Sequence, residues 1–378
     1  MLSYINDIIT RFGGRYFGSE QEKQAQLYTA DILRKYCDKV GVEEFQCALE
    51  GHFQSLKIFC LVYVLVLVLM RVDVRIAGIV GILNTILFLG HFVTYRHWLD
   101  FLFPKKTSWN VIGDIEPTGE VHDTLIVAGH IDSVKEFKWW YRLKHTGAIL
   151  SVLAGFVLPI FGLYAFFAIF IHAAWYTYGW WFFALLTPVL IVFFDMHGPD
   201  VVNGASDNLT GVAMAVEMAK VFSEDKLKHT RLRLISFGAE EAGLRGAWAY
   251  GKRHKEQLLK EKAFLFNIDT IKDVEHLTIG TSEVNTLVFY QQKYIDMVEQ
   301  AFIATGVAVK KLPLSVGASD GSAFHILGLP AICVIGMDSG KLDPAYHTRL
   351  DVIECINPQA LEALKKVLIR FVKTWDDK

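Results

Sequence analysis

The sequence predicts an α/β sandwich with a mostly parallel central sheet, interrupted by two inserted apolar blocks. Outside the blocks, short apolar runs alternate with helical segments, which is the pattern of a parallel sheet covered by helices. Inside the blocks, residues 58–95 and 147–194, the chain is apolar over lengths that suit membrane-spanning helices. The hydrophobic content of the 378-residue chain is 52%, which is high for a soluble protein and comes mainly from these blocks.

Charge and cysteine content exclude several classes of protein. The formal net charge is −2, so the composition does not suggest nucleic acid as a partner. The five cysteines are scattered, contain no CxxC pair and do not form a disulfide framework, which fits a reducing compartment. The first residues, MLSYINDIITRFGGRYFGSE, have no apolar run of the length found in a signal peptide, so we expect no export signal.

The elements of the sandwich follow from local patterns. A helix is predicted over residues 20–36, where apolar residues recur on one face. Buried strands are predicted at TLIVAG (124–129), LRLISFG (232–238), FLFNI (264–268) and AICVIG (331–336). Helices are predicted between and after them, at residues 211–223, 243–260, 287–305 and 358–374.

Each apolar block contains two hydrophobic segments, so each is predicted to form a transmembrane hairpin, at residues 57–96 and 146–195. A spanning helix needs about 20 apolar residues. The first segment reaches that length only if it begins near Phe53, with Lys57 extending its charged end to the membrane surface. The alternatives are helices buried in a large core, or an apolar seam between copies of the chain. Residues 1–56, 97–145 and 196–378 then form one discontinuous α/β domain.

Polar side chains follow each predicted strand. The residues are His130 and Asp132, Glu240 and Glu241, Asp269, and His347 in a polar loop; Asp207 joins them from the start of a helix. In open α/β sheets, ligands bind outside the carboxyl ends of the strands. We therefore expect these side chains to meet at one edge of the sheet.

Clustered carboxylates of this kind favour a metal site. Without a cation they would repel and raise each other's pKa values. Histidine with aspartate and glutamate, and no thiolate, suits zinc, with cobalt or manganese as substitutes. The set is too large for one tetrahedral zinc, but it fits two ions roughly 3.5–4 Å apart that share a carboxylate.

Six motifs, in order, resemble the co-catalytic zinc aminopeptidases, a family that also includes glutaminyl cyclases and glutamate carboxypeptidase. They are GHIDS, NGASDNLTGVA, EEAGLRG, NIDT, ASDGSAF with LGLPA, and DPAYHTRLD, and FGGRYFGSEQE near the N-terminus extends the match. The resemblance covers nearly all of the chain outside the apolar blocks and implies a three-layer sandwich. One departure is Gly321, where many relatives have histidine, and it puts the shape of the pocket in doubt.

The resemblance implies a role for each site residue. His130 and Asp269 would be terminal ligands of one zinc, Glu241 and His347 of the other, and Asp207 would bridge them. Glu240 would be the general base, Asp132 would fix the tautomer of His130, and Asp320 would orient His347. Tyr346 is a candidate oxyanion donor, with simple packing of its ring as the alternative.

The function implied is a membrane-anchored di-zinc aminopeptidase. A metal-bound hydroxide would attack the scissile carbonyl while Glu240 accepts and returns the proton. The substrate would be a peptide with a free N-terminus. The alternatives are a glutaminyl cyclase or a carboxypeptidase on the same scaffold, or a non-enzymatic receptor or scaffold component.

The distribution of basic residues predicts the topology of this multi-pass chain. Metal ligands occur before, between and after the blocks, so each hairpin must return the chain to one side. That side carries most of the flanking basic residues, namely Lys57, Arg96, Lys105, Lys106, Lys138, Arg142 and Lys144. The far side has only Arg71 and Arg75, around Asp73. Because basic residues favour the cytoplasm, we expect four spans, with both termini and the zinc site cytoplasmic. The bilayer is thus a partner, and the apolar hairpins could also mediate homo-oligomerisation.

Overall fold

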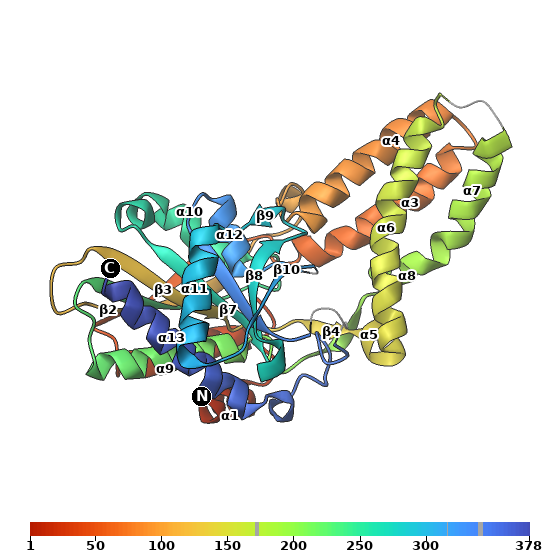
Figure 1. Ribbon diagram of the computed structural model, residues 1–378. Coiled ribbons are helices and arrows are strands. Elements are labelled where there is room, and N and C mark those ends of the chain that lie inside the picture. The colour runs from red at the N-terminus through yellow and green to blue at the C-terminus, as the bar shows by residue number, and fades with distance from the viewer. Residues whose placement is uncertain (171–173, 316, 339–342) are drawn as a thin grey trace. The chain divides into compact units, whose positions relative to one another are not determined.

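The computed structural model describes residues 1–170, 174–315, 317–338 and 343–378, and its contacts divide the chain into two compact units (Figure 1). Unit 1 comprises residues 1–49, 105–136 and 200–378, and unit 2 comprises residues 50–104 and 137–199. The domain limits given above from the sequence stay a prediction about which parts fold together.

Unit 1 is built on a nine-stranded sheet. Its order is β1 (Lys39–Cys47), β2 (Lys106–Ile115), β6 (Thr230–Phe237), β3 (Asp123–His130), β7 (Phe264–Ile271), β11 (Ala331–Gly336), β8 (Thr278–Glu283) and β10 (Lys310–Leu314), with β9 (Val288–Phe289) paired to β8. The four strands predicted from the sequence, β6, β3, β7 and β11, are neighbours and run parallel. Strands β1 and β2 add antiparallel pairs on one side, and β8 pairs antiparallel with β11 on the other. The α/β sandwich is confirmed, with a parallel centre inside a mixed sheet.

Helices cover both faces of this sheet, as the sequence predicts for a sandwich. They are α1 (Leu2–Phe12), α2 (Glu20–Leu33), α9 (Leu209–Glu224), α10 (Arg245–Lys260), α11 (Gln292–Thr305), α12 (Asp320–Ile326) and α13 (Pro358–Asp376), with 3₁₀ turns η4 (Val274–His276) and η5 (Ile353–Cys355). The five predicted helices are present, with ends that differ by a few residues. Buried asparagine Asn208 caps α9 by accepting a hydrogen bond from the amide of Gly211.

Successive side chains of the central strands point to opposite faces of the sheet, where they meet different helices. Gly129 of β3 lies against α9: a Cβ there would come within 2.7 Å of the Gly211 Cα, so only glycine permits this approach. Gly129 pairs with Ser236 of β6, and the next residue, Phe237, points to the opposite face. There Phe237 packs on Tyr250 of α10 and Phe324 of α12. The close approach on the first face brings the end of β3 and the start of α9 together.

Unit 2 is almost entirely helical. Its elements are α3 (Gly51–Leu69), α4 (Val74–Leu87), the π-helical turn η1 (Phe88–Val93), η2 (Asp100–Leu102), α5 (Lys138–Leu143), α6 (His145–Phe167), α7 (Ala174–Leu186), η3 (Thr187–Leu190) and α8 (Ile191–Phe194). The short sheet of β4 (Lys135–Phe137) and β5 (His197–Val201) contains the two positions where the chain enters and leaves residues 137–199 of unit 2.

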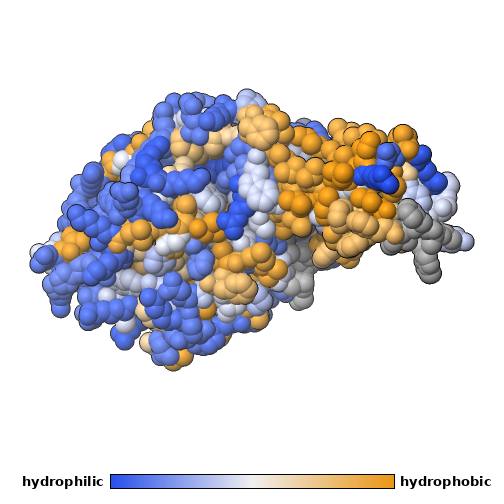
Figure 2. Space-filling model, turned by 90° about the horizontal axis from the view of Figure 1, so that it is seen from above, coloured by the Kyte–Doolittle hydropathy of each residue, from blue (hydrophilic) through white to orange (hydrophobic). Residues whose placement is uncertain are grey.

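Four helical segments of unit 2 are long and apolar enough to cross a membrane. They are Gly51–Leu69, Val74–Val93, His145–Phe167 and Tyr176–Phe194. The first has 19 residues, or about 28 Å at 1.5 Å per residue, so it begins early enough to reach the predicted length. Figure 2 shows hydrophobic residues gathered over these helices, as expected for a surface that faces lipid. The turn predicted within the second hairpin includes residues 171–173, which lie outside the described residues.

The helices of unit 2 pack through small residues and bond through polar ones. Gly78 and Gly81 of α4 lie against Ala165 and Gly162 of α6, so that the two backbones approach closely. The Tyr63 hydroxyl donates to the carbonyl of Phe183 at 2.8 Å. Such bonds satisfy polar groups that would be costly to leave unpaired in hydrocarbon.

Candidate metal centre

The predicted site residues meet at one edge of the sheet in unit 1. His130 ends β3, and Asp269 lies near the end of β7. Glu240 and Glu241 come from the loop that begins after β6 ends at Phe237. Asp207 precedes α9, and the start of α9 lies close to β3 because Gly129 and Gly211 face each other. His347 comes from the loop between β11 and η5. The fold therefore brings together residues that are far apart in the sequence.

Asp207 lies between the two histidines. Its Oδ1 atom is 3.3 Å from the Nε2 atom of His130, and its Oδ2 atom is 3.2 Å from the Nε2 atom of His347. Each oxygen of one carboxylate thus faces a different imidazole. This is the arrangement that a carboxylate shared by two metal ions requires.

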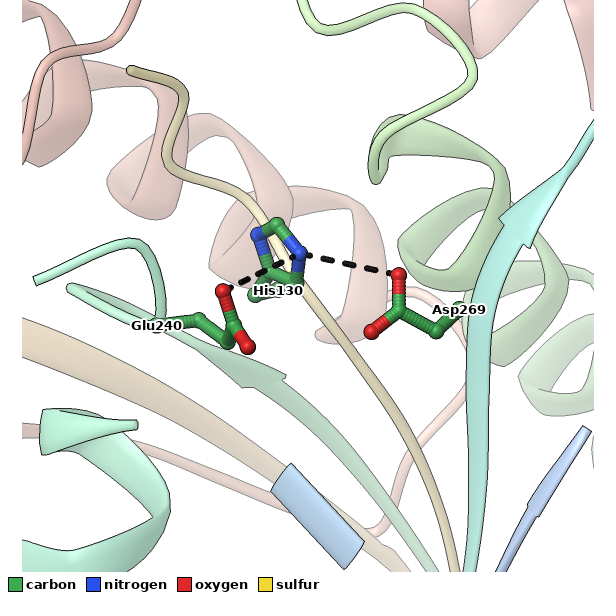
Figure 3. A group of neighbouring side chains, drawn as sticks. All are labelled: His130, Glu240 and Asp269. Carbon is green, nitrogen blue, oxygen red and sulfur yellow. Dashed lines mark ion pairs between the residues drawn. The ribbon is translucent and has the colours of Figure 1, made fainter. Parts of the chain in front are cut away.

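Two groups of side chains offer atoms that could hold a metal ion. His130, Glu240 and Asp269 form the first group and Asp207, Glu241 and His347 the second, with the ligand atoms of each group within 4.8 Å of one another. In the first group, the Nε2 atom of His130 is 3.6 Å from Glu240 Oε2 and 3.9 Å from Asp269 Oδ1 (Figure 3). In the second, His347 Nε2 is 3.0 Å from Glu241 Oε2.

Glu240 and Glu241 therefore turn toward different histidines, as expected for neighbours in an extended segment. Glu241 faces His347, as the sequence-based scheme has it. Glu240 lies in the first group, beside His130, where the scheme names Asp269 as the terminal carboxylate. The first group thus contains two carboxylates besides the shared Asp207, and the choice of Asp269 as ligand and Glu240 as base stays a prediction.

The charges of the cluster fit divalent cations. Burial raises the pKa of Asp269 to about 7 and raises that of Glu241, against the opposing effects of His130 and His347. Burial works against a charged His347, but Glu241 and Asp207 raise its pKa to about 10. Asp269 and Glu241 therefore tend to hold protons, whereas at Asp207 burial is outweighed by the two histidines, which lower its pKa. A bound cation would favour the charged form of all three carboxylates. The donor set is oxygen and nitrogen only, which suits zinc.

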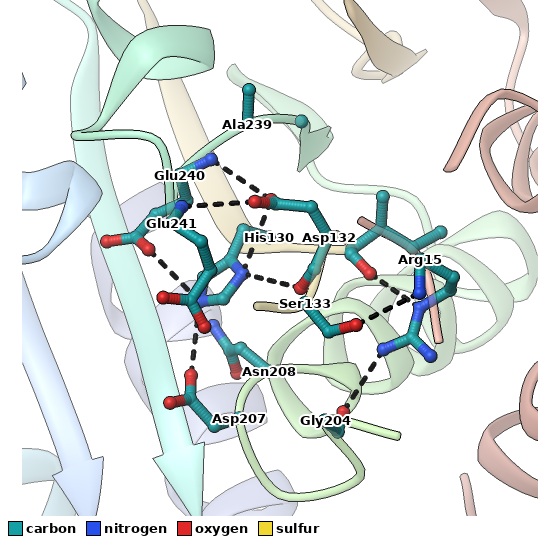
Figure 4. Close-up of polar contacts among 12 residues, drawn as sticks. Arg15, His130, Asp132, Ser133, Gly204, Asp207, Asn208, Ala239, Glu240 and Glu241 are labelled. Carbon is teal, nitrogen blue, oxygen red and sulfur yellow. Dashed lines mark hydrogen bonds and ion pairs between the residues drawn. The ribbon is translucent and has the colours of Figure 1, made fainter. Parts of the chain in front are cut away.

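Asp132 connects the histidine of the first group to the glutamate pair (Figure 4). Its Oδ1 atom lies 3.5 Å from the Nδ1 atom of His130, consistent with the predicted control of the tautomer. The same carboxylate accepts the backbone amides of Glu240 and Glu241, both at 3.0 Å. Asp132 thus fixes the loop that carries both glutamates, a contact that the sequence did not indicate.

Asp320 and Tyr346 lie near the centre with roles that stay predictions. Asp320 is fully buried, and neither of its carboxylate oxygens has a hydrogen-bond partner among the described residues. The charges that affect its pKa most strongly, after burial, are those of His130 and Asp269. The ring of Tyr346 stacks on the imidazole of His347 with centroids 3.8 Å apart. That contact is the one expected if the Tyr346 ring simply packs.

Two positioning residues were missed from the sequence. Asp351 accepts hydrogen bonds from the amide and hydroxyl of Ser206 and from the amide of Asp207, at 2.6–3.1 Å. Glu22, fully buried, accepts the amide of Ala239 at 2.9 Å. Both residues lie inside the quoted motifs, DPAYHTRLD and FGGRYFGSEQE, so the motifs were the available signal.

Part of the chain is similar to a known peptidase family. Residues 188–372 match the model of peptidase family M28. The chain is 31% identical over 170 residues to aminopeptidase YwaD of Bacillus subtilis (strain 168), a match that covers 42% of this chain and 35% of YwaD. The chain therefore spans about a third of the length of this curated relative.

Solved structures share the fold at low sequence identity. A zinc aminopeptidase from Bacillus subtilis, BSAP, superposes with a TM-score of 0.59 at 18% identity, covering 99% of this chain and 94% of that one. The glutaminyl cyclase of an Acidobacteriales bacterium gives a TM-score of 0.59 at 13% identity, covering 100% and 93%. The family resemblance seen in the sequence is confirmed over part of the chain: residues 188–372 match peptidase family M28, and the similar proteins include zinc aminopeptidases and a glutaminyl cyclase.

Proposed function

We propose that this chain is a membrane-anchored di-zinc aminopeptidase that removes N-terminal residues from peptides. The observation that carries the proposal is the position of Asp207, with one carboxylate oxygen toward each of two histidines that belong to separate ligand groups. The aminopeptidase relative supports the choice of reaction, because the matched region of the two chains is 31% identical.

The residues divide into two ligand sets around Asp207. His130 and Asp269 would hold one zinc, and Glu241 and His347 the other. When bound, the two ions would lower the pKa of a water molecule and polarise the substrate carbonyl. Asp132 would keep the Nε2 atom of His130 free for the metal by occupying its Nδ1 side.

Glu240 is the residue best suited to transfer a proton from water to the leaving nitrogen. Burial and the charges of Asp320 and Glu241 hold its pKa well above the ordinary value, against the opposing effect of His130. A carboxyl group with a raised pKa can both accept a proton from water and return it to the leaving nitrogen. Its Oε2 atom lies on the His130 side of the cluster, while its amide is held by Asp132. The backbone is thus fixed where the side chain must act.

The membrane anchor would consist of the two hairpins. Four segments have the length and apolar character for spanning, and many of their large apolar side chains are exposed, including Leu61, Ile79 and Phe156. In water such a surface would be costly, at about 25 cal/mol for each Å² of apolar area. In lipid it would be favourable. The bias of basic residues toward the flanks that join unit 1 supports a cytoplasmic peptidase unit.

A substrate panel tests the enzymatic proposal. The full chain in detergent, and its Glu240→Gln variant, would be assayed with aminoacyl fluorogenic substrates, glutaminyl peptides and N-blocked peptides, with and without added zinc. We expect zinc-dependent hydrolysis of free N-terminal residues, lost in the variant. Cyclisation of glutaminyl peptides alone would instead indicate a glutaminyl cyclase. Cleavage of N-blocked peptides would indicate a carboxypeptidase, and inactivity of zinc-loaded protein on every substrate would favour a non-enzymatic role.

A further inference from the structure

Arg15, in the turn between α1 and α2, is a buried cation that bonds to no carboxylate in the part of the chain that the structure describes. Its side chain has no exposed surface. Among the described residues, its guanidinium donates only to backbone carbonyls: Nε to Ile131, Nη1 to Gly13 and Asn203, each at 2.7 Å, and Nη2 to Gly204 at 3.3 Å. A buried charge is costly unless its donors are satisfied, and here four backbone carbonyls satisfy them.

Three of the four carbonyls that Arg15 binds belong to the two chain segments that carry His130 and Asp207 (Figure 4). Ile131 directly follows His130, and Gly204 lies three residues before Asp207. Between these segments the chain leaves unit 1 and forms residues 137–199 of unit 2. The two ligand segments are therefore separated by an entire apolar hairpin, and Arg15 contacts both of them.

Ser133 also links the N-terminal turn that contains Arg15 to the chain on both sides of residues 137–199. Its hydroxyl accepts the backbone amide of Arg15 at 2.9 Å and donates to the carbonyl of Val202 at 2.8 Å. The amide of Ser133 in turn donates to the carbonyl of Arg15 at 3.0 Å. The chain on both sides of the apolar hairpin is thus bonded to one N-terminal turn.

Gly204 is adapted to this contact. Its φ angle of +53° lies in the left-handed region, which favours glycine. A Cβ at this position would come within 2.5 Å of the Asp207 carbonyl oxygen and 3.2 Å of the Arg15 Nη2 atom. Because Gly204 has no side chain, the Arg15 guanidinium and the carbonyl of Asp207 can both lie close to its backbone.

The electrostatic partners of Arg15 include three carboxylates one step further away. Burial lowers the pKa of Arg15 to about 10, and the charges of Asp132, Tyr4, Asp351 and Glu22 oppose this effect. The three carboxylates among them hold the backbone amides of the Glu240–Glu241 loop and of Asp207. One guanidinium therefore lies among all three.

We propose that Arg15 is a positioning residue that sets the separation of His130 and Asp207, and thereby the affinity of the metal position formed by His130, Asp207 and Asp269. The inference rests on the proposed di-zinc function. The planar guanidinium of Arg15 has five N–H donors and binds four carbonyls at fixed angles, which the single ammonium of a lysine cannot do. The position formed by Glu241 and His347 shares Asp207 but lacks His130, so it depends less on this connection.

Metal titration of the full-length protein in detergent tests the proposal. Chelator-treated protein would be titrated with Zn²⁺ by calorimetry and with Co²⁺ by visible absorption. Asp269→Asn identifies the binding step of the His130 position, and Glu241→Gln identifies that of the other. In Arg15→Lys we expect about 10- to 100-fold weaker binding at the His130 position, the usual effect of losing an outer-shell partner of a ligand. At the Glu241 position we expect a change of less than about threefold.

Two further variants keep the test decisive. Ser133→Ala removes one bond on each side of the same connection, and we expect about fivefold weaker binding at the His130 position even if Arg15→Lys does not fold. Arg233→Lys is the matched control, because Arg233 is also buried but bonds to Asp114 away from the site. It should lower thermal stability and leave both metal affinities unchanged.

The outcomes separate the inference from the proposed function. If the unmodified protein binds two metal ions and Arg15→Lys and Ser133→Ala bind both as tightly, the positioning role is wrong. Equal weakening of both positions in Ser133→Ala would also overturn it, because that indicates a general loss of structure. If the unmodified protein does not bind two ions, the di-zinc proposal itself fails.

Discussion

Replacing each of two adjacent glutamates by glutamine should give opposite effects. Glu240→Gln keeps the size of the side chain and the backbone amide bond to Asp132, but removes the group that accepts a proton. The two metal positions keep His130 with Asp269, His347 with Glu241, and the shared Asp207. We therefore expect the variant to fold and to retain zinc. Only the step that needs proton transfer should be impaired.

The magnitude follows from the role. A positioned general base contributes about 10²–10⁴-fold to the rate. Since each tenfold is 1.36 kcal/mol, kcat should fall by an amount equivalent to about 2.7–5.4 kcal/mol of transition-state stabilisation. Glu241→Gln removes the carboxylate 3.0 Å from His347 Nε2, so it should weaken one metal position. Its main effect should be lost metal.

Metal content and kinetics, measured on the same preparations, decide the result. Inductively coupled plasma mass spectrometry would count zinc per chain, and kcat would be measured with excess zinc present. The reasoning is refuted if Glu240→Gln loses zinc while Glu241→Gln retains it. Loss of zinc from both variants would instead make Glu240 a ligand of the group that contains His130 and Asp269, and another residue would have to be the base.

Three further results are expected. Asp207→Ala should lose both zinc ions or nearly both, because its two oxygens serve both positions; a variant with full metal content by mass spectrometry would refute the bridge. Burial raises the pKa of Asp269 from 3.8 to about 7, so its contribution to the stability of chelated protein falls as pH rises from about 4 to about 7. Zinc, which replaces that proton, should therefore raise the melting temperature more at pH 8 than at pH 6, and an equal or smaller rise at pH 8 would contradict this. In a variant without the native cysteines, Asp73→Cys should react with an impermeant thiol reagent outside intact cells and Glu20→Cys should not. The reverse pattern would invert the topology, and extraction by carbonate would exclude spanning.

The sequence was most informative where chemistry and local pattern coincide. The four central strands were predicted because each is a short apolar run, and their carboxyl ends mark the edge at which His130, Asp269 and the glutamates meet. Asp207 was found because it opens a helix within a motif. The flanking strands β1, β2, β8 and β10 were not predicted, because their sequences mix polar with apolar residues and lack a continuous apolar run, even in β2, which is mostly buried.

The residues that hold the ligands in place were harder to find. Arg15, Glu22 and Asp351 act through backbone amides and carbonyls that are far from them in sequence. Such bonds have no periodicity and no required spacing, so a single sequence carries little sign of them. Burial of a charged residue inside a family motif is the closest signal, and burial is visible only in the structure.

The positions of the two insertions explain how apolar hairpins can be inserted between the metal-ligand segments while those segments stay close together. Residues 50–104 lie between β1 and β2, which pair antiparallel with Cys47 opposite Lys106, so the first insertion takes the place of a hairpin turn. Residues 137–199 similarly begin and end within the paired strands β4 and β5. In both cases strand pairing holds the ends of the insertion together. The entropy of closing a loop grows only as the logarithm of its length, so a long insertion at such a point costs little more than a short one. The second insertion separates His130 from Asp207, and strand pairing alone does not fix a ligand to a fraction of an ångström. The bonds from Arg15 and Ser133 to both of its ends supply that further restraint.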